Sequence, residues 1–223
     1  ELRKIINHAK FEKMKKSAEK NNYPLAGKTL IMIFEKPSLR TRLSFELAMK
    51  KLGGDVLVLD PKESHYGTQN ESIHDTAKIL SKFGDIVMLR SKNHKNFLEF
   101  SKYLEIPIIN GLTNMSHPCQ IMSDIMTFEE LNGPITNKKI VWLGDGNNIV
   151  YSLIEAAVQF SFNLVIACPK KLKPDAKIIE WAKKKKANIL ITGDPQKAAR
   201  GADAVITDKW ISMGDKTNKK KKK

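Results

Sequence analysis

Residues 29–42 read Thr-Leu-Ile-Met-Ile-Phe-Glu-Lys-Pro-Ser-Leu-Arg-Thr-Arg, an apolar run that passes through a polar loop into a helix. A short, continuous apolar run bounded by turn residues is typical of a strand buried in a parallel sheet. Residues 41–52 have helical character and end at Gly53 and Gly54, and glycine commonly ends a helix. This stretch therefore predicts one strand–loop–helix unit, with the loop at the carboxyl end of the strand.

The same alternation continues along the chain. We expect further strands at residues 55–59, 86–89, 106–109, 140–143, 164–167, 189–191 and 204–206, and further helices at residues 2–20, 71–83, 97–104, 120–131, 149–160, 175–186 and 195–200. Strand–helix alternation with short connections predicts an α/β fold with mostly parallel sheets flanked by helices. The pattern breaks most clearly at Asn132-Gly133-Pro134, so we expect two domains, residues 1–132 and 133–223.

Composition narrows the class of protein. The formal net charge of +15 fits either a nucleic-acid or anion partner or a lysine-rich surface. The lysines are scattered over expected helix faces without interleaved aromatic residues, which favours the surface and no nucleic-acid partner. A lysine-rich tail closes the chain at residues 219–223. No apolar run approaches the roughly 18–20 residues of a membrane span, and the charged start lacks a signal peptide, so we expect no membrane association.

The two cysteines, Cys119 and Cys168, form no CxxC motif and no paired Cys/His spacing. We therefore expect neither a disulfide framework nor a zinc site. Free thiols are typical of a reducing compartment, which favours a cytoplasmic location.

The loop at residues 35–40 has the chemistry of an anion site. Ligands of open parallel sheets bind beyond the carboxyl ends of the strands. The unpaired N–H groups of a helix start favour an anion, to which Ser38 and Thr41 add hydroxyl groups and Arg40 a guanidinium. The same residues also fit an ordinary helix N-cap with solvated arginines, and the loop chemistry alone leaves both interpretations open.

Other unusual residues also follow predicted strands. Arg90 follows residues 86–89, Asp208 follows residues 204–206, and His117 and Gln120 open a helix. Each has a plain alternative, as a surface arginine, a turn aspartate or a structural histidine. Gly144-Asp145-Gly146-Asn147-Asn148 begins like a dinucleotide fingerprint but has no third glycine, and no acidic residue closes the next strand. A nicotinamide cofactor is therefore disfavoured.

Taken in order, these stretches resemble the aspartate and ornithine carbamoyltransferase family over essentially the whole chain. Ser38-Leu39-Arg40-Thr41-Arg42 is similar to the family's Ser-Thr-Arg-Thr-Arg motif, with a departure at Leu39, and His117-Pro118-Cys119-Gln120 is similar to its His-Pro-x-Gln motif. Gly144 to Asn148 and the loop from Asp208 to Gly214 look like the ornithine branch. Aspartate carbamoyltransferases lack the second loop.

The resemblance implies transfer of a carbamoyl group from carbamoyl phosphate to the side-chain amine of L-ornithine, giving citrulline and phosphate, in arginine biosynthesis or a urea-type pathway. It implies catalytic roles for Arg90 and His117. The implied carbamoyl phosphate contacts are Ser38, Leu39, Arg40, Thr41, Arg90, His117 and Gln120, and the implied ornithine contacts are Asn148, Asp208, Ser212 and Met213.

The same resemblance implies a carbamoyl phosphate-binding domain at residues 1–132 and an ornithine-binding domain at 133–223, the second incomplete because relatives extend further. It also implies a homotrimer, a loop at residues 65–71 that reaches a neighbouring subunit's site, and no metal or organic cofactor.

Three alternatives stay open at this point. The acceptor could be acylated ornithine, putrescine or aspartate, although Asn148 and the Asp208 loop favour free ornithine. The chain could be an inactive fragment. Outside this class, a basic nucleic-acid-binding protein would need lysines gathered on one face and salt-sensitive binding.

Overall fold

The computed structural model describes residues 1–15, 23–60 and 71–208. Several predictions lie outside the described residues: those for Ser212, Met213, the lysine-rich tail, residues 65–70 and the last residues of the first helix. The chain separates into two compact units, one made of Phe11–Thr113 and the other of Glu1–Lys10 with the chain from Asn114 onward. Each unit is described by itself.

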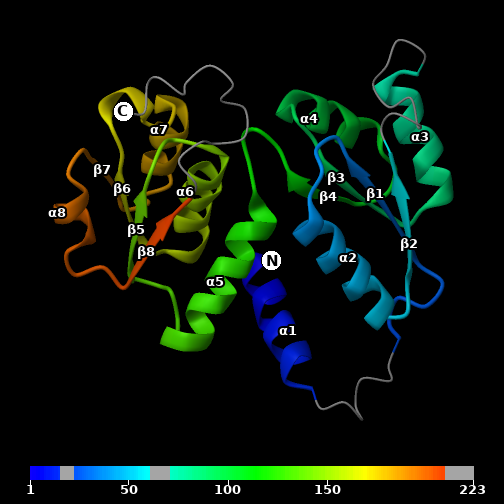
Figure 1. The fold of residues 1–223 in the computed structure, drawn as a ribbon, viewed down its shortest axis with the longest axis horizontal. Helices are drawn as coiled ribbons and strands as arrows, with labels where there is room; N and C mark the ends of the chain where they lie inside the picture. Colours follow the sequence, from blue (N-terminus) through cyan, green and yellow to red (C-terminus); the bar gives the residue numbers. More distant parts are fainter. Residues whose placement is uncertain (16–22, 61–70, 209–223) are drawn as a thin grey trace. The chain divides into compact units, whose positions relative to one another are not determined.

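The unit of Phe11–Thr113 holds a parallel four-stranded sheet in the order β2-β1-β3-β4. Helices cover both of its faces (Figure 1). The strands are β1 (Thr29–Phe34), β2 (Asp55–Leu59), β3 (Ile86–Arg90) and β4 (Ile108–Leu112), and the helices are α2 (Leu39–Lys51), α3 (Ile73–Phe83) and α4 (His94–Tyr103).

Alternation along β1 divides this core into two layers. Leu30 and Met32 pack against Met49 of α2, whereas Ile31 and Ile33 pack on the opposite face with residues of α3 and α4. Successive side chains of a strand point to opposite faces, so a strand buried on both faces must be apolar throughout. This explains why the run from Leu30 to Ile33 contains no polar residue.

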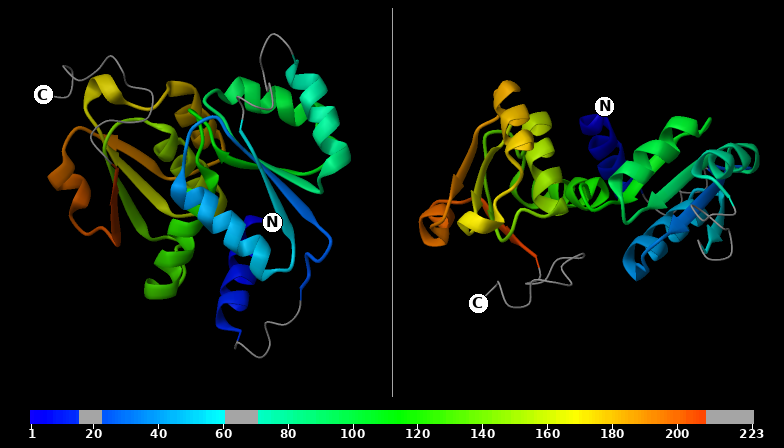
Figure 2. Two further views of the ribbon diagram at one scale, coloured as in Figure 1. Left: turned by 45° about the vertical axis from the view of Figure 1, so that its right-hand side comes forward. Right: turned by 90° about the horizontal axis from the view of Figure 1, so that it is seen from above.

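The other unit holds a second parallel sheet, in the order β7-β6-β5-β8. Figure 2 shows this sheet and its helices from two further sides. Its elements are the part of α1 (Leu2–Met14) up to Lys10, α5 (Pro118–Asn132), β5 (Lys139–Leu143), α6 (Asn148–Phe160), β6 (Asn163–Ala167), the short 3-10 helix η2 (Lys170–Leu172), α7 (Ala176–Lys184), β7 (Ile189–Thr192), α8 (Pro195–Ala199) and β8 (Ala204–Thr207).

Trp142 of β5 is fully buried on the face that α5, α6 and α7 cover, and Ala198 of α8 packs on the opposite face. The two sheets confirm the predicted α/β class with parallel sheets flanked by helices. No helix among residues 1–15, 23–60 and 71–208 is long and apolar enough to cross a membrane.

The compact units differ from the predicted domains of residues 1–132 and 133–223 in where α5 and the start of α1 belong. Ile121 and Ile125 of α5 and Ile6 of α1 are all buried in the core of the second sheet's unit. Burial of apolar surface is the main favourable contribution to packing, so the apolar face of α5 decides which unit this helix joins.

Candidate active site

The start of α2 exposes unpaired backbone N–H groups at the carboxyl end of β1. The helix begins at Leu39, two residues earlier than predicted, and Ser38 occupies the N-cap position. The Ser38 side chain makes no capping hydrogen bond, and its hydroxyl instead donates to Thr41 Oγ1 at 3.0 Å. The first N–H groups of the helix are therefore left without a side-chain cap from Ser38.

Arg90 joins this helix start from the neighbouring strand. It is the last residue of β3, pairs in register with Phe34 and is only 4% exposed. Its Nη1 donates to Thr41 Oγ1 at 3.3 Å. Because Thr41 Oγ1 already accepts from Ser38 and Arg90, its own hydroxyl proton is left to donate to another oxygen.

The charge of this region is positive. Within the described residues, neither Arg40 nor Arg90 forms an ion pair with a carboxylate, and Arg90 Nε has no hydrogen-bond partner. Burial, followed by the nearby charge of Arg40, lowers the pKa of Arg90. Arginine nevertheless stays protonated in proteins, so two guanidinium groups and a helix N-terminus lie together and form a candidate anion site.

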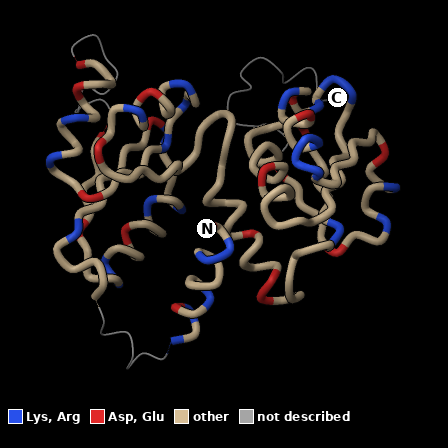
Figure 3. The backbone as a smooth tube through the Cα atoms, turned by 180° about the vertical axis from the view of Figure 1, so that it is seen from behind, with Lys and Arg blue, Asp and Glu red and all other residues tan. Residues whose placement is uncertain are grey.

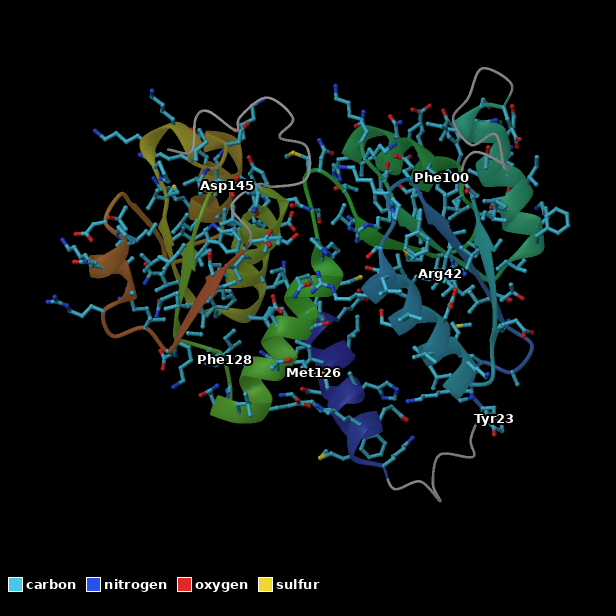
Figure 4. All side chains as sticks on the ribbon, in the orientation of Figure 1. Tyr23, Arg42, Phe100, Met126, Phe128 and Asp145 are labelled. Atoms are coloured by element: carbon cyan, nitrogen blue, oxygen red, sulfur yellow. The ribbon has the colours of Figure 1, made fainter. Side chains whose placement is uncertain are left out.

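Arg42 differs from these two arginines. Its Nε donates to Glu46 Oε1 at 2.7 Å, one turn further along the exposed side of α2. Figure 4 shows Arg42 on α2. This ion pair with Glu46 makes Arg42 a suitable control for the anion site.

Glu35 braces the anion site, a role that sequence reasoning missed. Its backbone N–H donates to the Arg90 carbonyl at 3.0 Å. Its carboxylate accepts from Ser91 Oγ at 3.1 Å and from the backbone N–H of Lys92 at 2.7 Å. These three bonds join the loop before α2 to the end of β3. The one signal in the sequence was an acidic residue inside an otherwise cationic loop.

His117 and Gln120 lie in the other unit, at the start of α5. His117 is the N-cap residue and Pro118 takes the first helical position. The backbone N–H of His117 donates to Ser152 Oγ of α6 at 2.8 Å. The Gln120 amide nitrogen donates to Asp124 Oδ1 at 2.8 Å. Burial raises the pKa of Asp124, and this hydrogen bond opposes the rise.

Asn148 opens α6 directly after the glycine loop that follows β5. Asn147 is the N-cap, and its side-chain oxygen accepts from the N–H groups of Ile149 and Val150 at 2.9 and 3.2 Å. Figure 4 shows Asp145 in this loop, where its carbonyl accepts from Trp142 Nε1 at 3.0 Å. The capping by Asn147 assigns Asn148 to the first turn of the helix.

Asp208 is exposed and follows β8, which pairs with β5. Thr207 Oγ1 donates to the Leu143 carbonyl at 2.9 Å, and these two residues are also partners in register. Asp208 therefore lies at the carboxyl end of β8, and the loop before Asn148 begins at the carboxyl end of the neighbouring strand β5.

The structure thus divides the predicted site residues between the units. One unit brings together Ser38, Leu39, Arg40, Thr41 and Arg90, and the other carries His117, Gln120, Asn148 and Asp208. Over the described part of the chain, no three or more His, Cys, Asp or Glu side chains are arranged to hold a metal ion. The basic residues are spread over both units with acidic residues among them (Figure 3).

Two family models match almost the whole chain. Residues 1–130 match the carbamoyl-phosphate-binding domain of the aspartate/ornithine carbamoyltransferases, and residues 136–223 match their aspartate/ornithine-binding domain. The chain belongs to the aspartate/ornithine carbamoyltransferase family.

Individual carbamoyltransferases agree with this assignment. The chain is 49% identical over 214 residues to an ornithine carbamoyltransferase of Brucella ovis, a match that covers 96% of this chain and 68% of that protein. Among solved structures, it resembles the ornithine carbamoyltransferase of Pyrococcus furiosus, with a TM-score of 0.90 and 41% identity over 97% of this chain and 70% of that one. The anabolic ornithine carbamoyltransferase of Campylobacter jejuni also has a TM-score of 0.90, with 36% identity over 99% and 73% of the two chains.

The departure from the carbamoyltransferase motif at Leu39 has a simple structural setting. Leu39 is the first residue of α2 and its side chain is 73% exposed. A side chain that points into solvent leaves the backbone N–H of the same residue at the helix start. Leucine at this position is therefore compatible with an anion bound by backbone N–H groups.

Proposed function

We propose that this chain transfers the carbamoyl group of carbamoyl phosphate to the side-chain amine of L-ornithine, giving citrulline and phosphate. The observation that carries the proposal is the anion site of Phe11–Thr113, where Arg40, Arg90 and the hydroxyl of Thr41 converge on the start of α2. The similarity to ornithine carbamoyltransferases supports ornithine as the acceptor.

In this proposal the phosphate group lies at the helix start. Ser38, Arg40, Thr41 and the backbone N–H of Leu39 hold its oxygens, because a guanidinium fork and helix N–H groups both bind phosphate well. The described residues place no ion-pairing carboxylate on Arg40 or Arg90 that the substrate would have to displace. An anionic substrate would therefore meet positive charge that is not already neutralised.

Arg90, Thr41 and His117 would face the carbonyl oxygen of the carbamoyl group, and Gln120 would hold its amide nitrogen. Negative charge develops on that oxygen as the amine attacks. Donors already aimed at it stabilise the transition state, and removing one such donor costs about 2.7–4 kcal/mol. Arg90 suits this role because its strand and its bond to Thr41 hold the guanidinium in place.

Ornithine would bind through Asn148, Asp208, Ser212 and Met213. A carboxylate such as Asp208 complements a cationic amino acid. The attacking amine must be neutral, and a free alkyl amine of this kind has a pKa of about 10.4. The amine nitrogen forms a bond to the carbamoyl carbon and loses a proton, while the bond from that carbon to the phosphate oxygen breaks. Positioning and electrostatics account for catalysis without a metal or an organic cofactor.

The wider setting is also proposed. The two free cysteines, Cys119 and Cys168, are consistent with a cytoplasmic protein, and the resemblance supports a homotrimer in arginine biosynthesis. The functional domains would be residues 1–132 and 133–223, although α5 packs with the second sheet. Analytical ultracentrifugation of the chain would test the trimer.

Calorimetric titration with carbamoyl phosphate tests the site. Wild type is expected to bind, Arg40→Ala to lose binding, and Arg42→Ala to keep it, because Arg42 is paired with Glu46 on the exposed side of the same helix. Equal loss in both variants would mean a general charge effect. A folded, trimeric wild-type chain that does not bind would overturn the site.

A panel of amines then tests the acceptor. Citrulline formation from ornithine, with little product from acylated ornithine, putrescine or aspartate, is the expected result. Preference for another amine would reassign the second substrate and leave the anion site intact. Salt-sensitive binding of nucleic acid in place of carbamoyl phosphate would favour the basic binding protein instead.

A further inference from the structure

A buried pair of serines joins the start of α5 to α6. Ser152 is 3% exposed and Ser116 is 9% exposed. Their hydroxyl oxygens are 3.2 Å apart, and Ser152 Oγ also accepts the backbone N–H of His117 at 2.8 Å. Buried polar groups of this kind are usually hydrogen-bonded. Here the partner is the backbone of a proposed catalytic residue.

The conformation of His117 gives this bond its importance. His117 is the N-cap of α5 and lies outside the helical region, with φ −138° and ψ 64°. An N-cap residue is only half inside its helix, so the helix ladder does not fix its N–H group. Pro118 restrains the following peptide. The bond to Ser152 restrains the preceding one, so the peptide planes on both sides of His117 are fixed.

Ser152 also has a defined relation to Asn148. The two residues are four positions apart on α6, and residues at this spacing lie on the same face of a helix. The face that meets the start of α5 therefore carries Asn148 one turn before Ser152. His117 and Asn148 are thus held by one rigid pair of helices within a single unit.

We propose that Ser152 is a positioning residue, which fixes the direction of the His117 ring by binding its backbone N–H and sets it relative to Asn148. This inference rests on the proposed function, in which His117 faces the carbonyl oxygen. The serine touches neither substrate. Its contribution lies in alignment, and a displacement of about 1 Å in a catalytic group can cost about 100-fold in rate.

The test compares Ser152→Ala with Ser81→Ala in the same full chain. Ser81 is a matched control, because its Oγ accepts the backbone N–H of Glu105 at 2.9 Å and donates to the Ala77 carbonyl. Glu105 precedes β4, so this bond lies near the amino ends of the strands, whereas Arg90 lies at the carboxyl end of β3. Both variants lose a serine bond to a backbone N–H, and only one of these bonds involves a proposed site residue.

We expect Ser152→Ala to lower kcat by about 10- to 100-fold and to leave the KM for ornithine and the affinity for inorganic phosphate within about twofold. Ser81→Ala should keep the wild-type kcat. The imidazole NMR signals of His117, assigned with His117→Gln, should shift or broaden in Ser152→Ala alone. A merely structural serine would lower stability without moving these signals.

Wild-type kcat and unchanged His117 signals in Ser152→Ala would overturn the proposal. If that variant fails to fold, Ser152→Cys keeps the volume but offers a weak acceptor, and it should lose kcat in the same direction; full activity with wild-type imidazole signals would equally overturn the proposal. Failure of the proposed function would show separately, as a wild-type chain that neither binds carbamoyl phosphate nor forms citrulline. The imidazole signals would still test the positioning.

Discussion

The carboxylate of Glu35 accepts a hydrogen bond from the backbone N–H of Lys92 at 2.7 Å, although 57 positions separate the two residues. Ser91, whose hydroxyl binds the other carboxylate oxygen, is only 1% exposed. A negative charge close to an anion site opposes substrate binding. Its presence is understandable because the two bonds hold the loop before α2 against the strand that ends in Arg90.

Replacing Glu35 should separate these two effects. Glu35→Ala removes both side-chain bonds, and hydrogen bonds to a charged group contribute about 1.5–3 kcal/mol, so we expect a loss of that size in the free energy of unfolding. Glu35→Gln keeps the shape and one acceptor. It should lose less stability and bind carbamoyl phosphate at least as tightly as wild type. Urea unfolding and calorimetry measure the two quantities, and an equal stability loss in both variants would contradict this account.

The buried charge of Arg90 should lower the free energy of unfolding, and it should be necessary for binding carbamoyl phosphate. It is 4% exposed, and burial followed by the charge of Arg40 lowers its pKa. Burying a charge costs desolvation free energy, and without a carboxylate partner little of that cost is offset. We expect Arg90→Met to raise the free energy of unfolding by about 1 kcal/mol or more and to abolish carbamoyl phosphate binding, as measured by urea unfolding and calorimetry.

Arg40→Met is the control for this trade-off, because Arg40 is exposed. It should lose binding without any gain in stability. Added phosphate should raise the melting temperature of wild type, since a ligand that binds only the folded state stabilises it, and should not raise that of either variant. A less stable Arg90→Met would show that the guanidinium has a structural role instead.

Sequence patterns predicted the elements well because the signals are local. Both sheets and the helices on them follow from apolar runs, glycines and helix periodicity. The bounds of two strands differ from the predicted ones for physical reasons. β3 continues through Arg90, because this strand pairs with both of its neighbours up to its last residue. β4 begins after Pro107, which has no N–H group to donate to the sheet. Arg90, which was predicted to follow the strand, is therefore its last residue and is buried.

The missed residues share one property, since each depends on a partner far along the chain. Ser152 is 35 positions from His117, and Glu129 is 126 positions from Arg3. No local spacing connects such residues. For the same reason, the sequence did not predict that His117 would pack with the second sheet while Arg90 packs in the first. That assignment depends on the apolar face of α5, which becomes clear only in the folded chain.

Gly146 should be required in the loop before Asn148. A Cβ atom at this position would lie 2.5 Å from the backbone nitrogen of Pro174, and the N–H of Gly146 binds the Leu172 carbonyl at 2.7 Å. The obstacle is backbone, which cannot rotate away. We expect Gly146→Ala to destabilise the chain by about 1–3 kcal/mol and to raise the KM for ornithine.

Gly193→Ala is the matched control for Gly146, because its added Cβ would meet nothing within 4 Å and its φ is not positive. It should leave both stability and the KM for ornithine close to wild type. Steady-state kinetics and urea unfolding of the two variants provide the comparison. A neutral Gly146→Ala would mean that η2 can move away from the loop, and that the loop does not depend on this close contact.

Glu129 should make the packing of α1 on α5 sensitive to acid. Its carboxylate, 3% exposed, accepts from Arg3 Nη1 at 2.6 and 2.7 Å, from Lys10 Nζ at 2.8 Å and from the Ile135 N–H at 3.1 Å. Burial alone would raise its pKa, but the hydrogen bonds from Arg3, Lys10 and Ile135 outweigh burial and lower it. Because the pKa is lower in the folded chain, the ionised carboxylate stabilises folding above its ordinary pKa of about 4.3, and this contribution is lost as the pH falls through the folded value.

Glu129→Gln should therefore cost about 2 kcal/mol in the free energy of unfolding at neutral pH, and the difference from wild type should shrink below about pH 4. Glu180→Gln makes the same change in charge at an exposed residue of α7 and should cost less than about 0.5 kcal/mol. Urea unfolding of the three chains from pH 7 to pH 3 measures both effects. A difference between Glu129→Gln and wild type that stays constant to pH 3 would mean that the stabilisation comes from packing of the side chain, because only the ionised carboxylate is lost on acidification.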